Sequence, residues 1–153
     1  FRMQFRTIVG CYTSGRIVMR ILNDTKLICD LPLCKFLLMN DSNYPWFILV
    51  PKRPNIIELF DLSKEERNQL DNEIYEVSKF INDSFKADKI NIASLGNIVS
   101  QFHIHVIARF SNDKAWPEAV WGKFPSKNYN PSELKIILNK FRNFSEKFKI
   151  NSI

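Results

Sequence analysis

The stretch that decides the fold is Gln101-Phe102-His103-Ile104-His105-Val106-Ile107-Ala108-Arg109, which holds both histidines of this 153-residue chain. Successive side chains of a β-strand point to opposite faces of the sheet. The alternation of polar and apolar residues therefore predicts a central strand over residues 101–110. One face carries core residues, and the other carries Gln101, His103, His105 and Arg109.

Two imidazoles in such a row favour phosphoryl or nucleotidyl transfer. An imidazole near neutral pH is a nucleophile toward phosphorus, and a second imidazole can bind or protonate the phosphate oxygens. We expect Arg109 and the backbone amides of the turn at Gly96-Asn97 to bind the same anion. The alternative is a pair of structural histidines whose nitrogens are satisfied by neighbouring polar groups.

The sequence around this strand predicts a single α+β domain with a mainly antiparallel sheet. Residues 26–53 contain two apolar runs separated by a polar turn, which is typical of paired strands. A helix begins after Ser63, which stands three residues before Glu66 as in a capping box. A last helix begins after Asn130, with proline at its first position. The apolar stripe of the first helix comprises Leu70, Ile74, Val77, Ile81 and Phe85.

Composition limits the partners and the compartment. No run approaches the roughly 18 apolar residues of a membrane span. A net charge of +6 favours an anionic partner without specifying it. The three cysteines (Cys11, Cys29 and Cys34) are too few for a disulfide scaffold and predict a cytoplasmic protein with buried thiols. The alternative for Cys29 and Cys34 is a zinc site shared with the histidines.

We expect residues 24–150 to form the domain and residues 1–23 to be an N-terminal extension. The extension holds four arginines and no acidic residue, a composition found in targeting segments. The apolar run before Cys11 is too short for the core of an export signal, so we predict no export.

Three segments carry a resemblance to a known family. Residues 96–106, Gly-Asn-Ile-Val-Ser-Gln-Phe-His-Ile-His-Val, closely resemble the signature of the histidine-triad (HIT) superfamily, His-φ-His-φ-His-φ-φ with φ apolar, preceded by a glycine turn. Residues 47–54 resemble the strand that ends in proline and basic residues in this superfamily. Residues 109–122 resemble a bacterial subgroup with Gln at the first triad position, similar to diadenosine polyphosphate hydrolases. The resemblance covers residues 24–122.

The resemblance implies a HIT-like α+β fold with about five strands, a long central helix and a C-terminal helix. It implies a homodimer that cleaves a nucleotide at its α-phosphate. His103 matches the nucleophile that forms a nucleotidyl-imidazole intermediate, His105 matches the histidine that contacts the phosphate, and Gln101 replaces the first histidine. In relatives an acidic or amide residue near the first hairpin contacts the ribose. Asn40 or Asp41 stands there, with a turn-forming role as the alternative.

Two departures from the family pattern bear on rate. Gln101 cannot titrate, so proton movement assigned to the first histidine is absent or supplied by water. Trp46 stands where many relatives place a further histidine. We therefore expect binding to survive better than turnover.

The substrates expected are dinucleoside polyphosphates or nucleoside phosphoramidates, with no metal or other cofactor required. A non-catalytic nucleotide-binding or sensing module is the first alternative. A metal-dependent enzyme that uses the His-x-His pair is the second, although the first acid after His105 is Asp113. Nucleic acid is not expected as a partner, because no recognised binding module is present.

Overall fold

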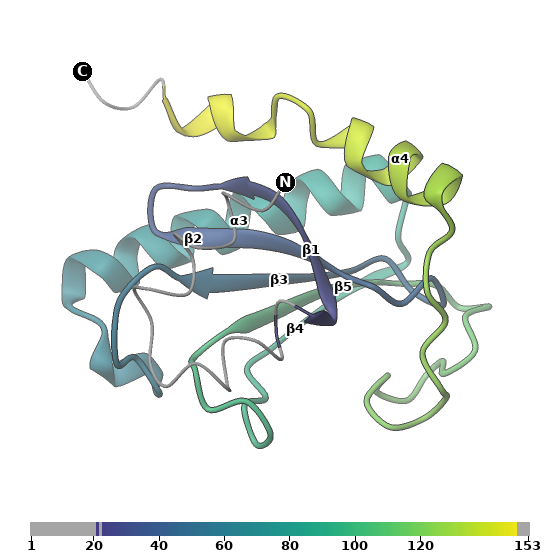
Figure 1. The fold of residues 1–153 in the computed structure, drawn as a ribbon, viewed down its shortest axis with the longest axis horizontal. Coiled ribbons are helices and arrows are strands. Elements are labelled where there is room, and N and C mark those ends of the chain that lie inside the picture. The colour runs from purple at the N-terminus through teal and green to yellow at the C-terminus, as the bar shows by residue number, and fades with distance from the viewer. Residues whose placement is uncertain (1–20, 22, 150–153) are drawn as a thin grey trace.

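The structure is a computed structural model that describes residue 21 and residues 23–149. Within this part of the chain, five antiparallel strands form one sheet in the order β1-β2-β3-β5-β4 (Figure 1). The strands are β1 (Thr25–Asp30), β2 (Cys34–Met39), β3 (Trp46–Pro51), β4 (Lys89–Ala93) and β5 (Ile104–Arg109). The helices are α3 (Lys64–Phe85) and α4 (Pro131–Lys140), with 3-10 turns at Leu59–Asp61 and Phe144–Phe148. The predicted α+β fold with a mainly antiparallel sheet, a long helix and a C-terminal helix is confirmed.

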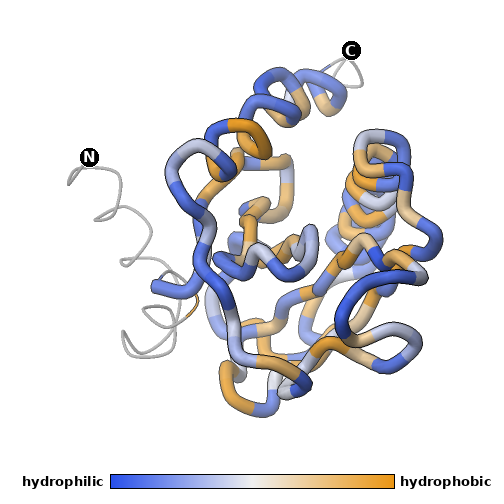
Figure 2. Tube along the Cα trace, turned by 90° about the vertical axis from the view of Figure 1, so that its right-hand side faces the viewer, coloured by the Kyte–Doolittle hydropathy of each residue, from blue (hydrophilic) through white to orange (hydrophobic). Residues whose placement is uncertain are grey.

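The main core lies between one face of the sheet and the two helical segments. Phe36 on β2 and Phe47 on β3 stack against Phe141 at the end of α4, with ring centroids 5.4 and 5.2 Å apart. From α3, the buried residues Leu70, Val77 and Ile81 complete this layer. Figure 2 shows hydrophobic and hydrophilic residues interspersed along the helices, as expected for elements with one buried face. The other face of the sheet is therefore left for the site.

Both predicted helix starts are confirmed in their hydrogen bonds. The Ser63 hydroxyl accepts from the Glu66 N–H, and the Glu66 carboxylate accepts from the Ser63 N–H. Asn130 and Glu133 form the same reciprocal pair before α4. Each pair satisfies backbone donors that the first helical turn leaves free.

Glu73 is a buried carboxylate that the sequence analysis did not single out. Its two oxygens accept the backbone N–H groups of Leu33 and Cys34, at 2.6 and 3.0 Å. Glu73 follows Leu70 by three residues and so lies on the buried stripe of α3, which is the signal that could have identified it. The contact joins α3 to the turn between β1 and β2.

The strand over the histidines is shorter than predicted, because β5 begins at Ile104 and not at residue 101. The Phe102 N–H donates to the Ile56 carbonyl, 2.9 Å away, outside the strand ladder. The Gln101 carbonyl is bonded to the His103 ring. Residues 101–103 therefore leave the sheet and bend around the site.

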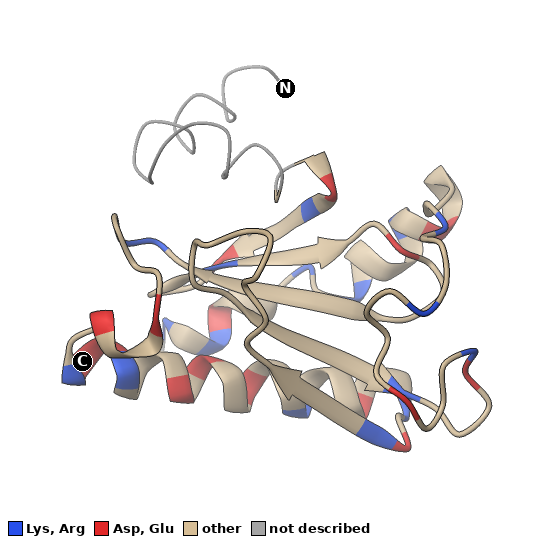
Figure 3. Ribbon diagram, turned by 90° about the horizontal axis from the view of Figure 1, so that it is seen from below, with Lys and Arg blue, Asp and Glu red and all other residues tan. Residues whose placement is uncertain are grey.

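Charged residues lie mainly on α3 and the loops, and the central strands carry few (Figure 3). Among the described residues, no helix is long and apolar enough to cross a membrane. Cys29 and Cys34 are unpaired. Burial raises the pKa of Cys29 to about 11 and that of Cys34 well above its usual value, so both thiols stay protonated near neutral pH.

Candidate functional site

A cavity of about 370 Å³ opens on the sheet face opposite the main core. Its polar lining residues are His103, His105, Asp24, Thr25 and Asn97. His105 on β5 pairs across the sheet with Ile48 on β3 and Ala93 on β4. The apolar wall comprises Ile21, Met39, Trp46, Ile48, Leu95, Ile98, Val99 and Trp121. An apolar hollow of this size with a few convergent polar groups is typical of a small-molecule site.

The Nε2 atom of His103 forms no hydrogen bond with the described residues. The Nδ1 atom of this ring lies 2.6 Å from the backbone carbonyl of Gln101, and a carbonyl can only accept, so Nδ1 carries the proton. Burial lowers the pKa of His103, and hydrogen bonding to backbone carbonyls, that of Gln101 first, partly offsets the shift. The ring is therefore neutral near pH 7, which is the state in which an imidazole attacks phosphorus.

The Nδ1 atom of His105 accepts a hydrogen bond, whereas that of His103 donates one. The ring centroid of His105 lies 4.8 Å from that of His103, and the indole Nε1–H of Trp46 donates to its Nδ1 at 3.0 Å. Its Nε2 is buried without a hydrogen-bond partner among the described residues. Burial, and then the neighbouring His103, lower the pKa of His105 to about 4, with an opposing contribution from the backbone of Leu95.

Gln101 is 2% exposed and lies next to the histidines in the chain. Within the described residues, neither its side-chain oxygen nor its nitrogen has a hydrogen-bond partner. Buried amides in folded proteins are normally bonded. Gln101 thus brings unused donors and an acceptor to the region around His103, although it does not itself line the cavity.

The Gly96-Asn97 turn reaches the site through its later residues. Asn97, Ile98 and Val99 line the cavity, whereas Gly96 does not. A Cβ atom at Gly96 would stand 3.0 Å from the Val99 carbonyl and 3.8 Å from the His103 ring. Glycine is needed here because of this close approach, since a side chain would press on the Val99 carbonyl and contact the His103 ring.

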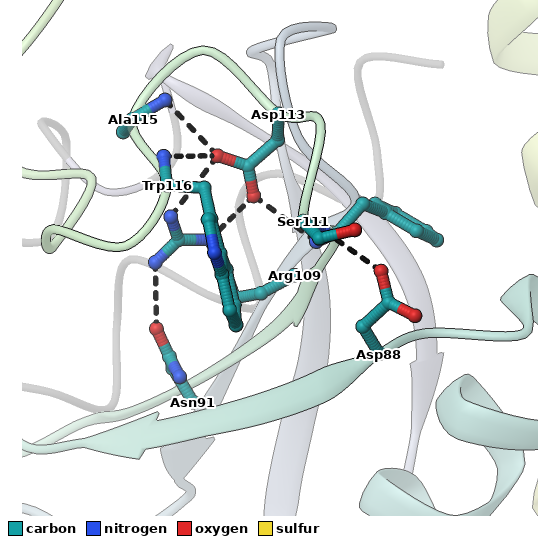
Figure 4. Close-up of polar contacts among 8 residues, drawn as sticks. Asp88, Asn91, Arg109, Ser111, Asp113, Ala115 and Trp116 are labelled. Atoms are coloured by element: carbon teal, nitrogen blue, oxygen red, sulfur yellow. Dashed lines mark hydrogen bonds and ion pairs between the residues drawn. The ribbon is translucent and has the colours of Figure 1, made fainter.

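Arg109, which we expected to bind the anion, is engaged by side chains of its own chain (Figure 4). Its guanidinium forms a bidentate ion pair with Asp113, at 2.8 and 3.0 Å, and donates to the Asn91 side chain at 2.8 Å. It is 1% exposed and is not among the residues that line the cavity. Arg109 shares the strand face of the histidines, but Asp113 neutralises its charge and anchors the loop that follows β5.

The side chains of Asn40 and Asp41 likewise accept hydrogen bonds from backbone N–H groups of the chain itself. Asp41 Oδ1 accepts from the backbone N–H groups of Asn43 and Lys127, and Asn40 Oδ1 accepts from that of Tyr129. They line a second hollow, which adjoins the histidine cavity at Trp46. The contact of Asp41 with Asn43 supports the turn-forming role, whereas the contacts with Lys127 and Tyr129 join this turn to a distant segment of the chain.

Several cavity residues were missed in the sequence. Ile21 lies before the predicted domain start at residue 24, yet it lines the cavity and its carbonyl accepts from the Thr25 hydroxyl. Trp121 packs edge-on against His105, with ring centroids 5.1 Å apart, and the Trp-Gly dipeptide at residues 121–122 was its only signal. In the described part of the chain, no three His, Cys, Asp or Glu side chains cluster in a way that could hold a metal ion.

Comparison with known proteins agrees with this geometry. The family model of the HIT domain matches residues 21–112. A histidine triad protein from Bradyrhizobium japonicum is 44% identical, with a TM-score of 0.80 over 81% of this chain and 92% of that chain. A histidine triad protein from Marinobacter aquaeolei VT8 is 38% identical, with a TM-score of 0.82 over 85% and 95%.

A third solved structure, a HIT protein from Sinorhizobium meliloti 1021, is 39% identical and aligns with a TM-score of 0.78 over 80% of this chain and 90% of that chain. No curated protein matches the chain. The family model covers more than half of the sequence, and the three solved structures agree with it in fold and in sequence. The chain belongs to the HIT domain family.

Proposed function

We propose that this protein cleaves nucleotides at the α-phosphate through a nucleotidyl intermediate on His103. Membership of the HIT family implies nucleotide binding and hydrolase-type chemistry. The observation that carries the proposal is the pairing of His103, whose Nε2 can attack, with His105, whose Nε2 can donate, in one cavity. A nucleophile beside a hydrogen-bond donor is what transfer of a charged phosphorus group requires.

The reaction has two displacements. The Nε2 lone pair of His103 attacks the α-phosphorus, and the bond from phosphorus to the leaving-group oxygen breaks with its electron pair on that oxygen. Water then attacks the same phosphorus, loses a proton to solvent, and displaces the His103 nitrogen. The Nε2–H of His105 donates to a phosphate oxygen, where negative charge grows in each transition state.

The leaving group is best supplied as an anion. Gln101 cannot protonate it, and neither ring nitrogen facing the cavity carries an acidic proton near pH 7. A polyphosphate leaves as a stable anion, whereas an amine needs a proton as the bond to phosphorus breaks. Among the substrates expected from the sequence, we therefore place dinucleoside polyphosphates, as in the diadenosine polyphosphate hydrolase-like subgroup, ahead of phosphoramidates.

A substrate panel tests this function. Dinucleoside polyphosphates and nucleoside phosphoramidates are assayed for release of nucleoside monophosphate, with His103→Ala as the blank. We expect turnover of the polyphosphates by the wild-type protein alone. Nucleotide binding without turnover of any panel member would contradict the proposal. It would support the second candidate, a nucleotide-binding or sensing module. The presence at position 101 of a glutamine, which cannot titrate, is the observation that favours this candidate.

We also propose that the protein acts as a cytoplasmic homodimer. Strand β4 is an edge strand of the sheet, and its Ile92 and the neighbouring Tyr75 of α3 are 50% and 59% exposed and line one shallow hollow. An exposed edge with apolar residues is suited to pairing with a second copy. Light scattering should give twice the monomer mass for the wild-type protein, and a lower mass for the Ile92→Lys variant. A monomeric wild type would contradict the proposal.

A further inference from the structure

We infer that Trp46 is a positioning residue that fixes His105 as an Nε2–H donor toward the substrate phosphate. The inference rests on the proposed function for its chemical meaning, but not for its structural content. It follows from the hydrogen bond between the buried side chains of Trp46 and His105, and from the His105 Nε2 atom, which has no partner among the described residues.

The direction of this hydrogen bond is set by the indole. An indole N–H can only donate, so the Nδ1 atom it contacts must carry a lone pair. A neutral imidazole with an unprotonated Nδ1 carries its proton on Nε2. The 3.0 Å contact between Trp46 and His105 therefore selects one tautomer of His105.

The alternative states of His105 are penalised by burial. A proton on Nδ1, in the other tautomer or in the imidazolium, would face the indole N–H and leave that donor unpaired. Trp46 and His105 are 7% and 4% exposed, so water cannot readily replace the lost partner. An unpaired buried donor disfavours a state by about tenfold to a hundredfold. Burial also lowers the pKa of His105 to about 4, in agreement with a ring that stays neutral.

The strand register places the Trp46 indole within hydrogen-bond reach of His105. Trp46 on β3 pairs with Ile107 on β5, so His105 is its diagonal neighbour on the same sheet face. A diagonal neighbour is within reach of an aromatic side chain. The Nε2 atom is the ring nitrogen that the indole leaves without a partner among the described residues, and His105 is one of the residues that line the cavity.

The two histidines consequently have opposite tautomers. The Gln101 carbonyl holds the proton of His103 on Nδ1 and leaves the lone pair on Nε2, whereas Trp46 holds the proton of His105 on Nε2 and leaves a donor there. His103 and His105 thereby act as an acceptor and a donor toward the substrate, although both rings are neutral. Trp46 acts through His105 and is not itself a catalytic residue.

The first test reads the tautomers directly. Because the chain has only two histidines, long-range ¹H–¹⁵N correlation spectra of ¹⁵N-labelled protein at pH 7.5 give two ring patterns, assigned with His103→Asn. We expect one Nδ1-protonated ring and one Nε2-protonated ring, the latter being His105. A wild-type His105 that is protonated on Nδ1, or that averages between tautomers, would overturn the inference.

Two tryptophan variants separate the hydrogen bond from packing. Trp46→Phe removes the donor, so the His105 pattern should become an average of both tautomers. Trp121→Phe is the matched control: Trp121 also packs on His105, but it forms no hydrogen bond with that ring, and the His105 pattern should not move. An unchanged pattern in Trp46→Phe would overturn the inference. If that variant fails to fold, the wild-type spectrum still decides.

Kinetics test the consequence for turnover. Trp46→Phe should lower kcat by about tenfold while KM changes less, because the donor acts on charge that grows in the transition state. Trp46→His keeps a ring N–H near the indole position and should recover most of kcat, although it loses more packing than Phe. A lower kcat for Trp46→His than for Trp46→Phe would assign the effect to packing. Absence of turnover in every protein would refute the proposed function and leave the spectra as the test of Trp46.

Discussion

The polar face of β5 has two ends that look alike in sequence and differ in structure. At one end His105, together with His103 just before the strand, lines a cavity, and His105 Nε2 has no partner among the described residues. At the other end, Arg109 directs its guanidinium at Asp113 and Asn91 (Figure 4). Polar groups that the protein leaves unpaired are available for a ligand, whereas fully paired groups hold the structure together. The first end should therefore govern turnover and the second end stability.

The largest effect is expected from His103→Asn. The variant loses the nucleophile and should lower kcat by about 10⁴-fold or more, because the bond to phosphorus forms only along the reaction path. Nucleotide affinity by calorimetry should stay within a few fold. Undiminished turnover would show that the cavity end of β5 does not carry the chemistry.

The opposite end is tested by Arg109→Leu. This change leaves Asp113, which is 6% exposed, buried without its partner, and should lower the free energy of unfolding by about 3–5 kcal/mol. Denaturant unfolding measures the loss. Arg109→Lys keeps a positive charge beside Asp113 and should lose less stability than Arg109→Leu. If Arg109→Leu instead kept full stability and lost nucleotide binding, Arg109 would belong to the site.

Acidic pH should weaken the fold through the histidines. The pKa of both is lowered by burial, to about 4 for His105, so below about pH 6.5 the unfolded chain binds protons that the folded chain does not. Stability is then lost as pH falls, by about 2 kcal/mol between pH 7 and 5 for His105 alone. Urea unfolding at both values measures the change. The control His103→Asn/His105→Asn should lose most of this dependence, and an equal dependence would contradict the assignment.

Turnover should also fall at acidic pH, when the two histidine rings become protonated. Burial lowers the pKa of both rings, so kcat/KM should fall at a pH below the ordinary pKa of histidine and not at it. A pH profile of the wild-type protein measures this. A fall centred on pH 6.5 would show that the rings are more exposed to solvent than their burial indicates.

The smallest effect is expected at Gln101. As a buried amide that does not ionise, it should orient a neighbouring group and not transfer a proton. Gln101→Leu should lower kcat by a few fold, since one hydrogen bond is worth about 1 kcal/mol. Gln101→His should keep or raise kcat. Equal rates for the three proteins would show that the position has no role in the site.

Local rules predicted much of this molecule. Period-two alternation assigned the two faces of β5, and capping residues placed the starts of α3 and α4. What local rules could not supply was the partner of each polar side chain. Lys127 donates to Asp41 from 86 residues away, and Glu73 binds Leu33 from 40 residues away. Such contacts form only when the chain has folded, so the sequence did not reveal that Arg109 and Asp41 were already engaged.

The most direct test of the central claim is detection of the covalent intermediate. Wild-type protein is mixed with an α-phosphate-labelled dinucleoside polyphosphate, quenched within one turnover at alkaline pH, and digested for mass spectrometry. The account predicts a nucleotidyl group that is acid-labile, attached to His103, and missing from His103→Asn. Release of product with no adduct at any time point, or an adduct on His105, would contradict it.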